Sequence, residues 1–224
     1  MKTTRRQFLK TSATALVAAP AIVRGSNLNS KLQLAAIGAD GKGYSDITNM
    51  ADHGRAVHVA FCDVDLARTA KALELQSEAA VFQDYREMFD ELGDKIDAVS
   101  VSTPDHMHAF IALDAMRRGK HVYCQKPLTH TVWEARQMAL QATKSKVITR
   151  MGNQIHSHTH YRTAVRAVQA GKIGKIKRVH SWVNAAGHGR SGLISRPKGT
   201  PAIPKSLDWN KWLGAAPERP YGGD

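Results

Sequence analysis

The stretch KLQLAAIGADGKG, residues 31–43, decides how the chain begins to fold. An apolar run ends at Gly38, and glycine recurs at Gly41 and Gly43 where a helical pattern begins. Glycine at such positions permits a tight turn, close approach of the backbone to a diphosphate, and close packing of helix on strand. The stretch therefore predicts a strand, a dinucleotide-binding loop and a helix. The loop residues expected to bind the cofactor are Gly38, Ala39, Gly41 and Gly43.

One position departs from the G-x-G-x-x-G pattern of such loops. Asp40 occupies the middle glycine position, where a carboxylate is unfavourable next to a diphosphate unless it points away. Gly41 is the neighbour that could take the missing glycine's place. A plain glycine turn is the alternative interpretation.

Asp63 favours the nucleotide interpretation. It follows a second apolar run, Ala56–Cys62, and lies about twenty residues past the loop, where a carboxylate accepts the ribose hydroxyls of NAD. Because a carboxylate repels a 2′-phosphate, we expect NAD as the cofactor, with NADP less favoured. The alternative role for Asp63 is a helix cap, for which Asp65 is the better candidate.

Strand and helix patterns alternate along residues 31–150, which predicts βαβ units and a parallel sheet covered by helices on both faces. The expected fold class is α/β, a Rossmann-like doubly wound parallel sheet followed by the start of an α+β substrate domain. The predicted strands are Lys31–Ile37, Ala56–Cys62, Asp97–Ser102, His121–Cys124 and Lys146–Met151, and the predicted helices include Ile47–Asp52, Ala67–Leu75, Tyr85–Leu92, His106–Arg118 and Val132–Thr143.

A change of pattern near residue 151 suggests a domain boundary there. We expect a helix over Tyr161–Ala170, a long alternating strand over Ile176–Ala186, and a loop over Gly187–Pro204. A single strand cannot form a stable sheet, so residues 151–224 are expected to be an incomplete substrate domain.

The first thirty residues are expected to be a signal peptide. Thr4–Lys10 matches the twin-arginine export pattern, and the apolar stretch Ala13–Val23 is too short for a membrane span. Ala19 and Ala21 offer a cleavage site of the A-x-A type. We therefore expect an exported, periplasmic protein that engages the twin-arginine translocase, which carries folded proteins and so suits one that binds its cofactor before export. An ordinary basic N-terminus is the alternative.

Composition argues against nucleic acid as a partner. The net charge is +13, but residues 31–150 are nearly neutral, and the Lys and Arg residues after them are scattered rather than clustered. The two cysteines, Cys62 and Cys124, each end an apolar run, which favours buried free thiols over a disulfide.

Two further loops carry a family resemblance. Ser102–His108 reads STPDHMH after the predicted strand Asp97–Ser102, and Cys124–Leu128 reads CQKPL after the next. With the glycine loop and the segment Leu207–Pro220, they make the chain resemble the Gfo/Idh/MocA family from Lys31 to about Pro220. The resemblance implies NAD(P)-linked oxidation or reduction of a sugar, cyclitol or related alcohol.

The resemblance also implies roles for individual residues. Lys126 corresponds to the lysine of the family's E-K-P motif, which hydrogen-bonds the reacting hydroxyl and assists proton transfer. We expect this lysine to be buried, which would suit that role, and a solvated surface lysine is the alternative. Thr103 and Pro104 are expected to line the nicotinamide side of the cleft. The cofactor-binding residues implied beyond the glycine loop and Asp63 are Ser102, Thr103, Pro104, His106, Gln125 and Lys126.

Two departures from the family matter. Gln125 replaces the family's glutamate and removes a negative charge beside Lys126. The family's later Asp/His pair would lie beyond Asp224, so we expect a fragment of a longer protein that forms a homo-oligomer when complete.

Residues after the sheet offer candidate substrate contacts. Asn153 and Gln154 follow a predicted strand end and could bind a polyol, with structural capping as the alternative. No metal site is predicted, because the histidines at 156, 158 and 160 lack carboxylate partners nearby. Tryptophans 182, 209 and 212 are expected in the core rather than as a sugar platform.

Two other functions are compatible with these motifs. An NAD-dependent glycoside hydrolase could be built on the same fold. A non-catalytic nucleotide- or sugar-binding relative is the third possibility, favoured by the departures at Asp40 and Gln125.

Overall fold

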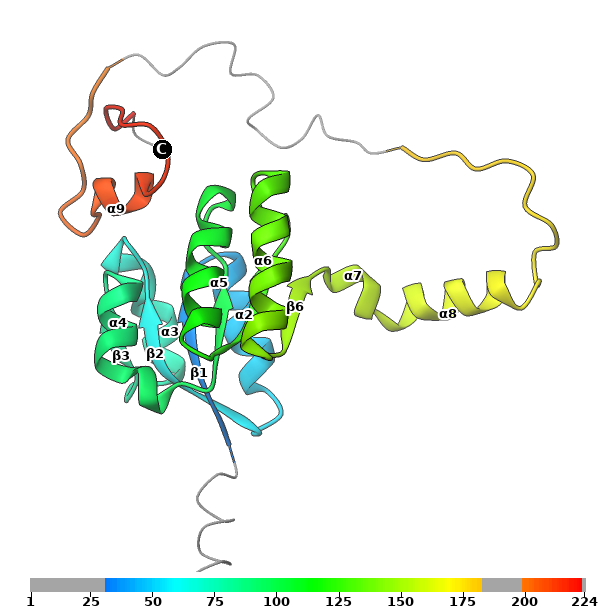
Figure 1. Cartoon of the computed structure of the whole chain (residues 1–224), viewed down its shortest axis with the longest axis horizontal. Coiled ribbons are helices and arrows are strands. Elements are labelled where there is room, and N and C mark those ends of the chain that lie inside the picture. The colour runs from blue at the N-terminus through cyan, green and yellow to red at the C-terminus, as the bar shows by residue number, and fades with distance from the viewer. Residues whose placement is uncertain (1–30, 183–198, 223–224) are drawn as a thin grey trace, which may run out of the picture.

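The computed structural model describes residues 31–182 and 199–222, and in them a single six-stranded parallel sheet organises the chain (Figure 1). The strand order is β3-β2-β1-β4-β5-β6, and every neighbouring pair is parallel. The predicted α/β, doubly wound class is therefore confirmed. The strands are β1 (Leu32–Ile37), β2 (Ala56–Cys62), β3 (Ala80–Phe82), β4 (Ala98–Val101), β5 (His121–Gln125) and β6 (Thr149–Gly152).

Helices fill the connections between the strands. Short 3₁₀ turns precede or follow three of them, so the predicted helix Ala67–Leu75 begins as a 3₁₀ turn, and so does the predicted helix His106–Arg118. The helical elements are α2 (Lys42–Ala51), η1 (Leu66–Thr69), α3 (Ala70–Leu75), α4 (Tyr85–Leu92), η2 (Gly93–Lys95), η3 (Asp105–Met107), α5 (His108–Arg117), α6 (Val132–Ser145), α7 (Gln154–Ser157), α8 (Thr159–Gln169) and α9 (Trp209–Leu213).

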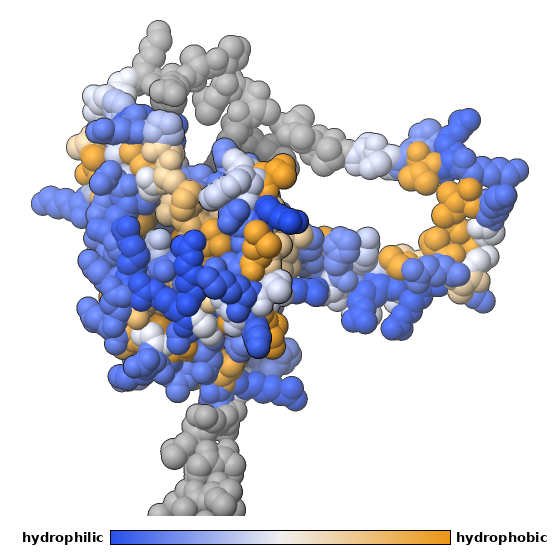
Figure 2. Space-filling view, in the orientation of Figure 1, coloured by the Kyte–Doolittle hydropathy of each residue, from blue (hydrophilic) through white to orange (hydrophobic). Residues whose placement is uncertain are grey.

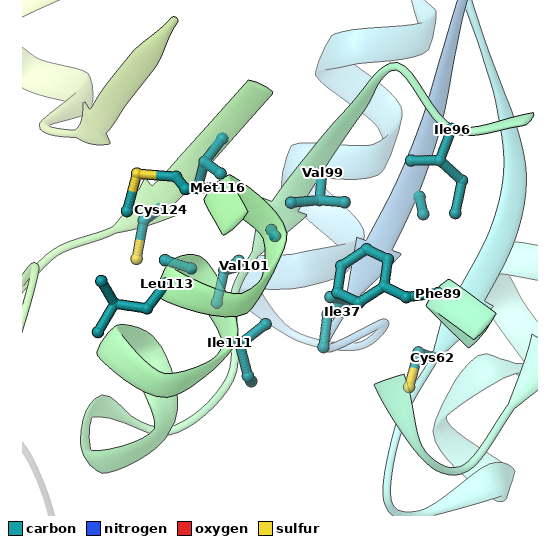
Figure 3. Close-up of a cluster of buried hydrophobic side chains, with 14 of the residues drawn as sticks. Ile37, Cys62, Phe89, Ile96, Val99, Val101, Ile111, Leu113, Met116 and Cys124 are labelled. Atoms are coloured by element: carbon teal, nitrogen blue, oxygen red, sulfur yellow. The ribbon is translucent and has the colours of Figure 1, made fainter. Parts of the chain in front are cut away.

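Apolar side chains cover both faces of the central strands. On β1, Ala35 and Ile37 join the cluster that α4, α5 and α6 cover, while Ala36 joins a smaller cluster beneath α2 and α3. Figure 3 shows the larger cluster, in which Phe89 of α4 lies close to Ile37. Burial on both faces is typical of parallel sheets and explains the near-continuous apolar runs in the sequence.

The strands that follow β1 in the sequence lie on both sides of it in the sheet. β2 and β3 lie on one side of β1, and β4, β5 and β6 lie on the other. The order therefore reverses between β1 and β4, and the loops at the carboxyl ends of these strands diverge there. In open parallel sheets, that crevice is where ligands bind.

The predicted strand over Ile176–Ala186 does not form in its described part. Residues 176–182 have no regular structure, and residues 183–186 lie outside the described ranges, as does most of the predicted loop Gly187–Pro204. No described strand lies beside residues 176–182 to accept their backbone hydrogen bonds. Trp182, expected in a core, has 86% of its surface exposed.

Two segments lie beyond the sheet. Helices α7 and α8 extend away from the domain and bury none of their residues, and Figure 2 shows apolar patches on this arm. Residues 199–222, which include α9, return to the domain, where Asp65 forms a β-bridge with Leu207. No helix within the described residues is long and apolar enough to cross a membrane. The predicted signal peptide, residues 1–30, lies outside them.

Candidate functional site

The glycine loop lies at the crevice between β1 and β4. Gly38 has a φ of +87°, and a Cβ added to it would stand 2.6 Å from the Ser102 carbonyl oxygen. A Cβ on Gly43 would stand 2.0 Å from the Gly38 carbonyl oxygen. Both glycines are thus required by close backbone contact, and they bring the N-terminus of α2 against the end of β1. Helix N-termini with free amides favour anions such as a diphosphate.

Gly41 and Asp40 explain how the loop tolerates its departure from the glycine pattern. Gly41 precedes α2 with a φ of +56°, and nothing lies within 4 Å of where its Cβ would be. The Asp40 carboxylate lies 3.3 Å from Nη1 of Arg68, whose Nε lies 3.6 Å from Asp65. The negative charge at position 40 is therefore balanced by a cation from the neighbouring βα connection.

Asp63 lies directly after β2 and faces the same loop. Its Oδ2 accepts a hydrogen bond from the Ala39 amide at 2.9 Å, and its Oδ1 accepts one from the Asp65 amide at 3.0 Å. Burial raises the pKa of the Asp63 carboxyl above its ordinary value, and the two amides oppose that rise. Asp65, rather than Asp63, caps the following 3₁₀ turn, through the amide of Ala67.

A cavity of about 1080 Å³ opens beside the loop. It brings together five of the residues predicted for the cofactor: Gly38, Asp63, Ser102, Thr103 and Pro104. Thr103 contributes a buried hydroxyl that has no hydrogen-bond partner among the described residues. A glycine cradle, a carboxylate and an unmatched hydroxyl on one wall fit an adenine dinucleotide.

The C-terminal segment, residues 204–221, forms the opposite wall of this cavity. The Leu66 amide donates to the Ser206 carbonyl at 3.0 Å, and the Asp208 amide donates to the Val64 carbonyl at 2.9 Å. The Trp209 and Trp212 rings stack with centroids 4.8 Å apart and are only partly buried, so they line the cavity instead of filling the core.

His106 contacts this segment. Its Nε2 lies 3.0 Å from the Trp212 carbonyl oxygen, and its ring packs against the Trp212 indole. The contact fastens η3 to α9. His106 does not line the cavity that holds the other predicted cofactor residues.

Lys126 follows β5 at the carboxyl edge of the sheet. The expectation that it is buried is wrong, because β5 ends at Gln125 and the lysine lies exposed in the bend that follows. Lys126 is not part of the cavity wall, and the peptide bond joining it to Pro127 is cis.

His108, which the sequence placed only at the start of a predicted helix, links two of the functional loops. Its side chain is 1% exposed, with Nδ1 lying 2.6 Å from the Pro127 carbonyl oxygen and Nε2 lying 2.8 Å from the Thr103 carbonyl oxygen. One imidazole therefore ties the loop after β4 to the loop after β5. In the sequence, only the position of this histidine, five residues after Thr103, could have indicated that it links the two loops.

A buried polar network lies beneath these loops, and the sequence analysis missed its central residue, Asp46. Oδ2 of Asp46 accepts hydrogen bonds from Ser102 Oγ at 2.9 Å and from Gln125 Nε2 at 2.7 Å. Oδ1 pairs with the Lys42 ammonium. Gln125 is 3% exposed and in turn accepts a hydrogen bond from Gln154 Nε2 at 2.8 Å. The signal in the sequence was an aspartate next to the apolar Ile47, on the helix that follows the glycine loop.

The remaining candidates lie after β6. Asn153 precedes α7 and makes no side-chain capping bond, whereas Gln154 is exposed apart from its bond to Gln125. The histidines at 156, 158 and 160 are exposed, and the described residues contain no cluster of three or more potential metal ligands. Both cysteines are buried free thiols, as predicted.

Comparison with known proteins is consistent with this geometry. A family model described as "Oxidoreductase family, NAD-binding Rossmann fold", the GFO_IDH_MocA model, matches residues 32–153. A 1,5-anhydro-D-fructose reductase from Ensifer adhaerens is 33% identical over 105 residues, which are 46% of this chain and 32% of that protein. Glycosyl hydrolase family 109 protein 1 from Shewanella sp. (strain ANA-3) is 29% identical over 150 residues, 62% of this chain and 32% of that protein.

Among solved structures, myo-inositol 2-dehydrogenase from Lactobacillus plantarum superposes with a TM-score of 0.61 and 27% identity. The match covers 65% of this chain and 43% of that one. The chain thus spans about a third of the length of the two curated relatives described above.

Proposed function

Because this chain belongs to the Gfo/Idh/MocA family of oxidoreductases, with its NAD-binding Rossmann fold, we propose that it serves hydride transfer between nicotinamide and a sugar, cyclitol or related alcohol. The observation that carries the proposal is the shared wall of Gly38, Asp63 and Thr103 in one cavity at the switch point of the sheet. The names of the relatives, a reductase and a dehydrogenase of small polyhydroxylated compounds, support the substrate class.

The residues of the cavity support NAD over NADP. Asp63 stands where the adenosine ribose is held in such folds, and its carboxylate would accept hydrogen bonds from two ribose hydroxyls but would repel a 2′-phosphate. The glycine loop and the N-terminus of α2 would hold the diphosphate. Ser102, Thr103 and Pro104 continue this wall toward the nicotinamide end.

Bound NAD would supply the hydride acceptor. On the chain's side, Nζ of Lys126 is proposed to donate a hydrogen bond to the oxygen of the reacting hydroxyl and so to assist the departure of the hydroxyl proton to a nearby base. Asn153 and Gln154, at the next strand end, are proposed to bind other hydroxyls of the substrate. Loss of the proton at oxygen accompanies loss of hydride at carbon, so a base close to that oxygen is what the chemistry requires.

Calorimetric titration of NAD into the 224-residue chain tests the proposal. We expect saturable binding, weakened about tenfold by Asp63→Asn, since one charge-assisted hydrogen bond is worth about 1.5 kcal/mol or more. Asp90→Asn serves as the matched control, because that carboxylate is exposed and, among the residues that the structure describes, pairs only with Arg118. Absence of NAD binding by the unaltered chain would remove the redox assignment.

The same titration has a predicted pH dependence. Burial raises the pKa of Asp63, so the carboxyl becomes protonated at a higher pH than an exposed aspartate would. Only the carboxylate can accept from both ribose hydroxyls, and NAD affinity should therefore fall as the pH is lowered through that pKa. The Asp63→Asn variant should lack this decrease; an identical pH profile in both proteins would contradict the role of Asp63.

Similarity to a family 109 glycosyl hydrolase favours a second candidate function, NAD-dependent glycoside cleavage on the same fold. Release of a chromophore from an aryl glycoside, with NAD present and no net NADH formed, would support this second function. Net NADH formation from a free polyol would support the first.

Export through the twin-arginine translocase to the periplasm, and homo-oligomer formation, are part of the proposal. Thr4–Lys10 supports the export route. Replacing both Arg5 and Arg6 by lysine should retain the protein in the cytoplasm of a host with this translocase. Unchanged fractionation would exclude the route, and sedimentation of the complete protein at monomer mass would exclude the oligomer.

A further inference from the structure

The carboxylate of Asp46 is the most deeply buried charge close to the candidate site. Asp46 is 4% exposed, and its carboxylate accepts hydrogen bonds from the side chains of Lys42, Ser102 and Gln125. Ser102 directly follows β4 and Gln125 ends β5, while Asp46 and Lys42 belong to α2, the helix that follows the glycine loop. One side chain therefore connects three elements of the candidate site.

This carboxylate fixes the orientation of the Gln125 amide. An ionised carboxylate can only accept hydrogen bonds, so Gln125 must direct its Nε2 toward Asp46. Its Oε1 then faces the opposite way, where Gln154 donates to it at 2.8 Å. If the Gln125 amide were flipped, its Oε1 would face the Asp46 carboxylate oxygen, and its NH₂ group would face the NH₂ group of Gln154. The direction of each hydrogen bond, from Lys42 through to Gln154, follows from the single charge on Asp46.

The same geometry explains why position 125 holds glutamine. The Nε2 atom lies 2.7 Å from Asp46 Oδ2, so a glutamate here would bring two buried carboxylates into contact. Like charges at that distance in a site shielded from water are strongly unfavourable. The negative charge that the E-K-P pattern carries next to its lysine is present in this chain on α2 instead.

We propose that Asp46 is a positioning residue and that Asp46 and Gln125 form a matched charge–amide pair. The pair aligns the Lys126–Pro127 loop with Gln154, and it connects both to the glycine-loop helix. The purpose of this alignment rests on the proposed function, since Lys126 and Gln154 are the residues proposed for proton transfer and for substrate binding. Asp46 acts through Gln125 and Ser102, because it lines no part of the cavity itself.

A reciprocal exchange tests the pair. Four proteins are compared by thermal unfolding and by NAD titration: the unaltered chain, Asp46→Asn, Gln125→Glu and the double variant. Gln125→Glu alone should lower the melting temperature by about 10 °C, because two carboxylates then share one buried site. The double variant should recover more than half of that loss, since an asparagine at 46 can donate to a glutamate at 125, which also accepts from Gln154.

A local measurement separates positioning from general stability. Hydrogen exchange followed by mass spectrometry should show faster exchange in peptides covering residues 124–128 and 152–155 of Gln125→Glu, with protection restored in the double variant. Gln169→Glu is the matched control, the same chemical change at an exposed position of α8. It should leave the melting temperature and both peptides unchanged.

The outcomes distinguish this inference from the proposed function. If the double variant is no more stable than the sum of the single losses predicts, or if it fails to fold, the matched pair is overturned. Equal stability of Gln125→Glu and the unaltered chain overturns it as well. Recovery of stability and protection in the double variant supports the pair even when no protein in the series binds NAD, a result that would overturn the proposed function alone.

Discussion

Two segments that both predict a strand have opposite fates in this molecule. Residues 56–62 form an apolar run, and residues 176–182 begin the stretch that was expected to be a long alternating strand. The first forms β2, hydrogen-bonded to β1 on one side and to β3 on the other. The second has no regular structure, and its Val179 is 78% exposed. Alternation therefore describes a segment that could cover one face of a sheet, but a strand forms only where a neighbour accepts its backbone hydrogen bonds.

The helices show the same contrast. Helix α5 buries seven of its ten residues against the sheet, whereas α8 buries none of its eleven. Yet α8 has the stronger separation of apolar and polar faces of the two. Amphipathic spacing thus predicts the helix, while the burial that stabilises it depends on having a surface to cover. The difference between residues 32–153 and residues 154–182 can be tested by matched substitutions in the two regions.

The largest expected effect comes from paired glycine substitutions. In Gly43→Ala the new Cβ would stand 2.0 Å from the Gly38 carbonyl oxygen, so α2 must move away from β1. We expect a loss of about 4 kcal/mol or more in the free energy of unfolding, close to the total stability of many domains. Gly174→Ala meets no atom within 4 Å and should cost about 1 kcal/mol at most, for its positive φ. Urea unfolding followed by circular dichroism measures both; equal losses would contradict the contrast.

The next effect is an acid sensitivity confined to the sheet region. Burial lowers the pKa of His58 on β2 from 6.5 to about 4, so the folded chain keeps this imidazole neutral. Unfolding takes up a proton below pH 6.5, and the stability present above that pH is lost progressively as the pH falls toward 4, by roughly 3 kcal/mol.

His58→Phe should remove this loss of stability while keeping an aromatic ring against Phe61. In the unaltered chain the His58 and Phe61 rings stack with their centroids 5.6 Å apart. His160→Phe on the exposed α8 is the control and should leave the pH dependence as it is. Urea unfolding between pH 4 and 7 gives the comparison. A parallel decline in the His58→Phe protein would show that other groups cause the acid sensitivity.

The smallest effect is expected from a valine truncation outside the sheet. Val99 on β4 is 1% exposed, and Val99→Ala should cost about 2 kcal/mol through lost burial and the cavity it leaves. Val179→Ala should change the free energy of unfolding by less than about 0.5 kcal/mol. A larger loss at Val179 would show that residues 176–182 pack against something in solution.

The sequence predicted the sheet region well because its signals are local. The ends of β2 and α4 agree with the predicted Ala56–Cys62 and Tyr85–Leu92, since apolar periodicity and capping residues such as Asp84 mark them. β3 was missed because its three residues are too few to show a period, and only pairing with β2 makes them a strand.

For the site, the loop glycines and Asp63 were predictable because backbone geometry and strand ends restrict which residue fits there. The roles of His108 and Asp46 were not. His108 shows its role only when the loops after β4 and β5 lie on either side of it. The Lys126 side chain was expected to be buried and is exposed, because the end of β5, and not the identity of the residue, decides its burial.

What the sequence by itself determined was the order of strands and helices, the glycine turn and the carboxylate after β2. These follow from steric limits and hydrophobic periods that act over a few neighbouring residues. Only the tertiary structure decided that Asp46 meets Gln125, 79 residues away, and that residues 204–221 close the cavity. Such contacts depend on how the sheet brings distant loops to one edge, a geometry that no local pattern contains.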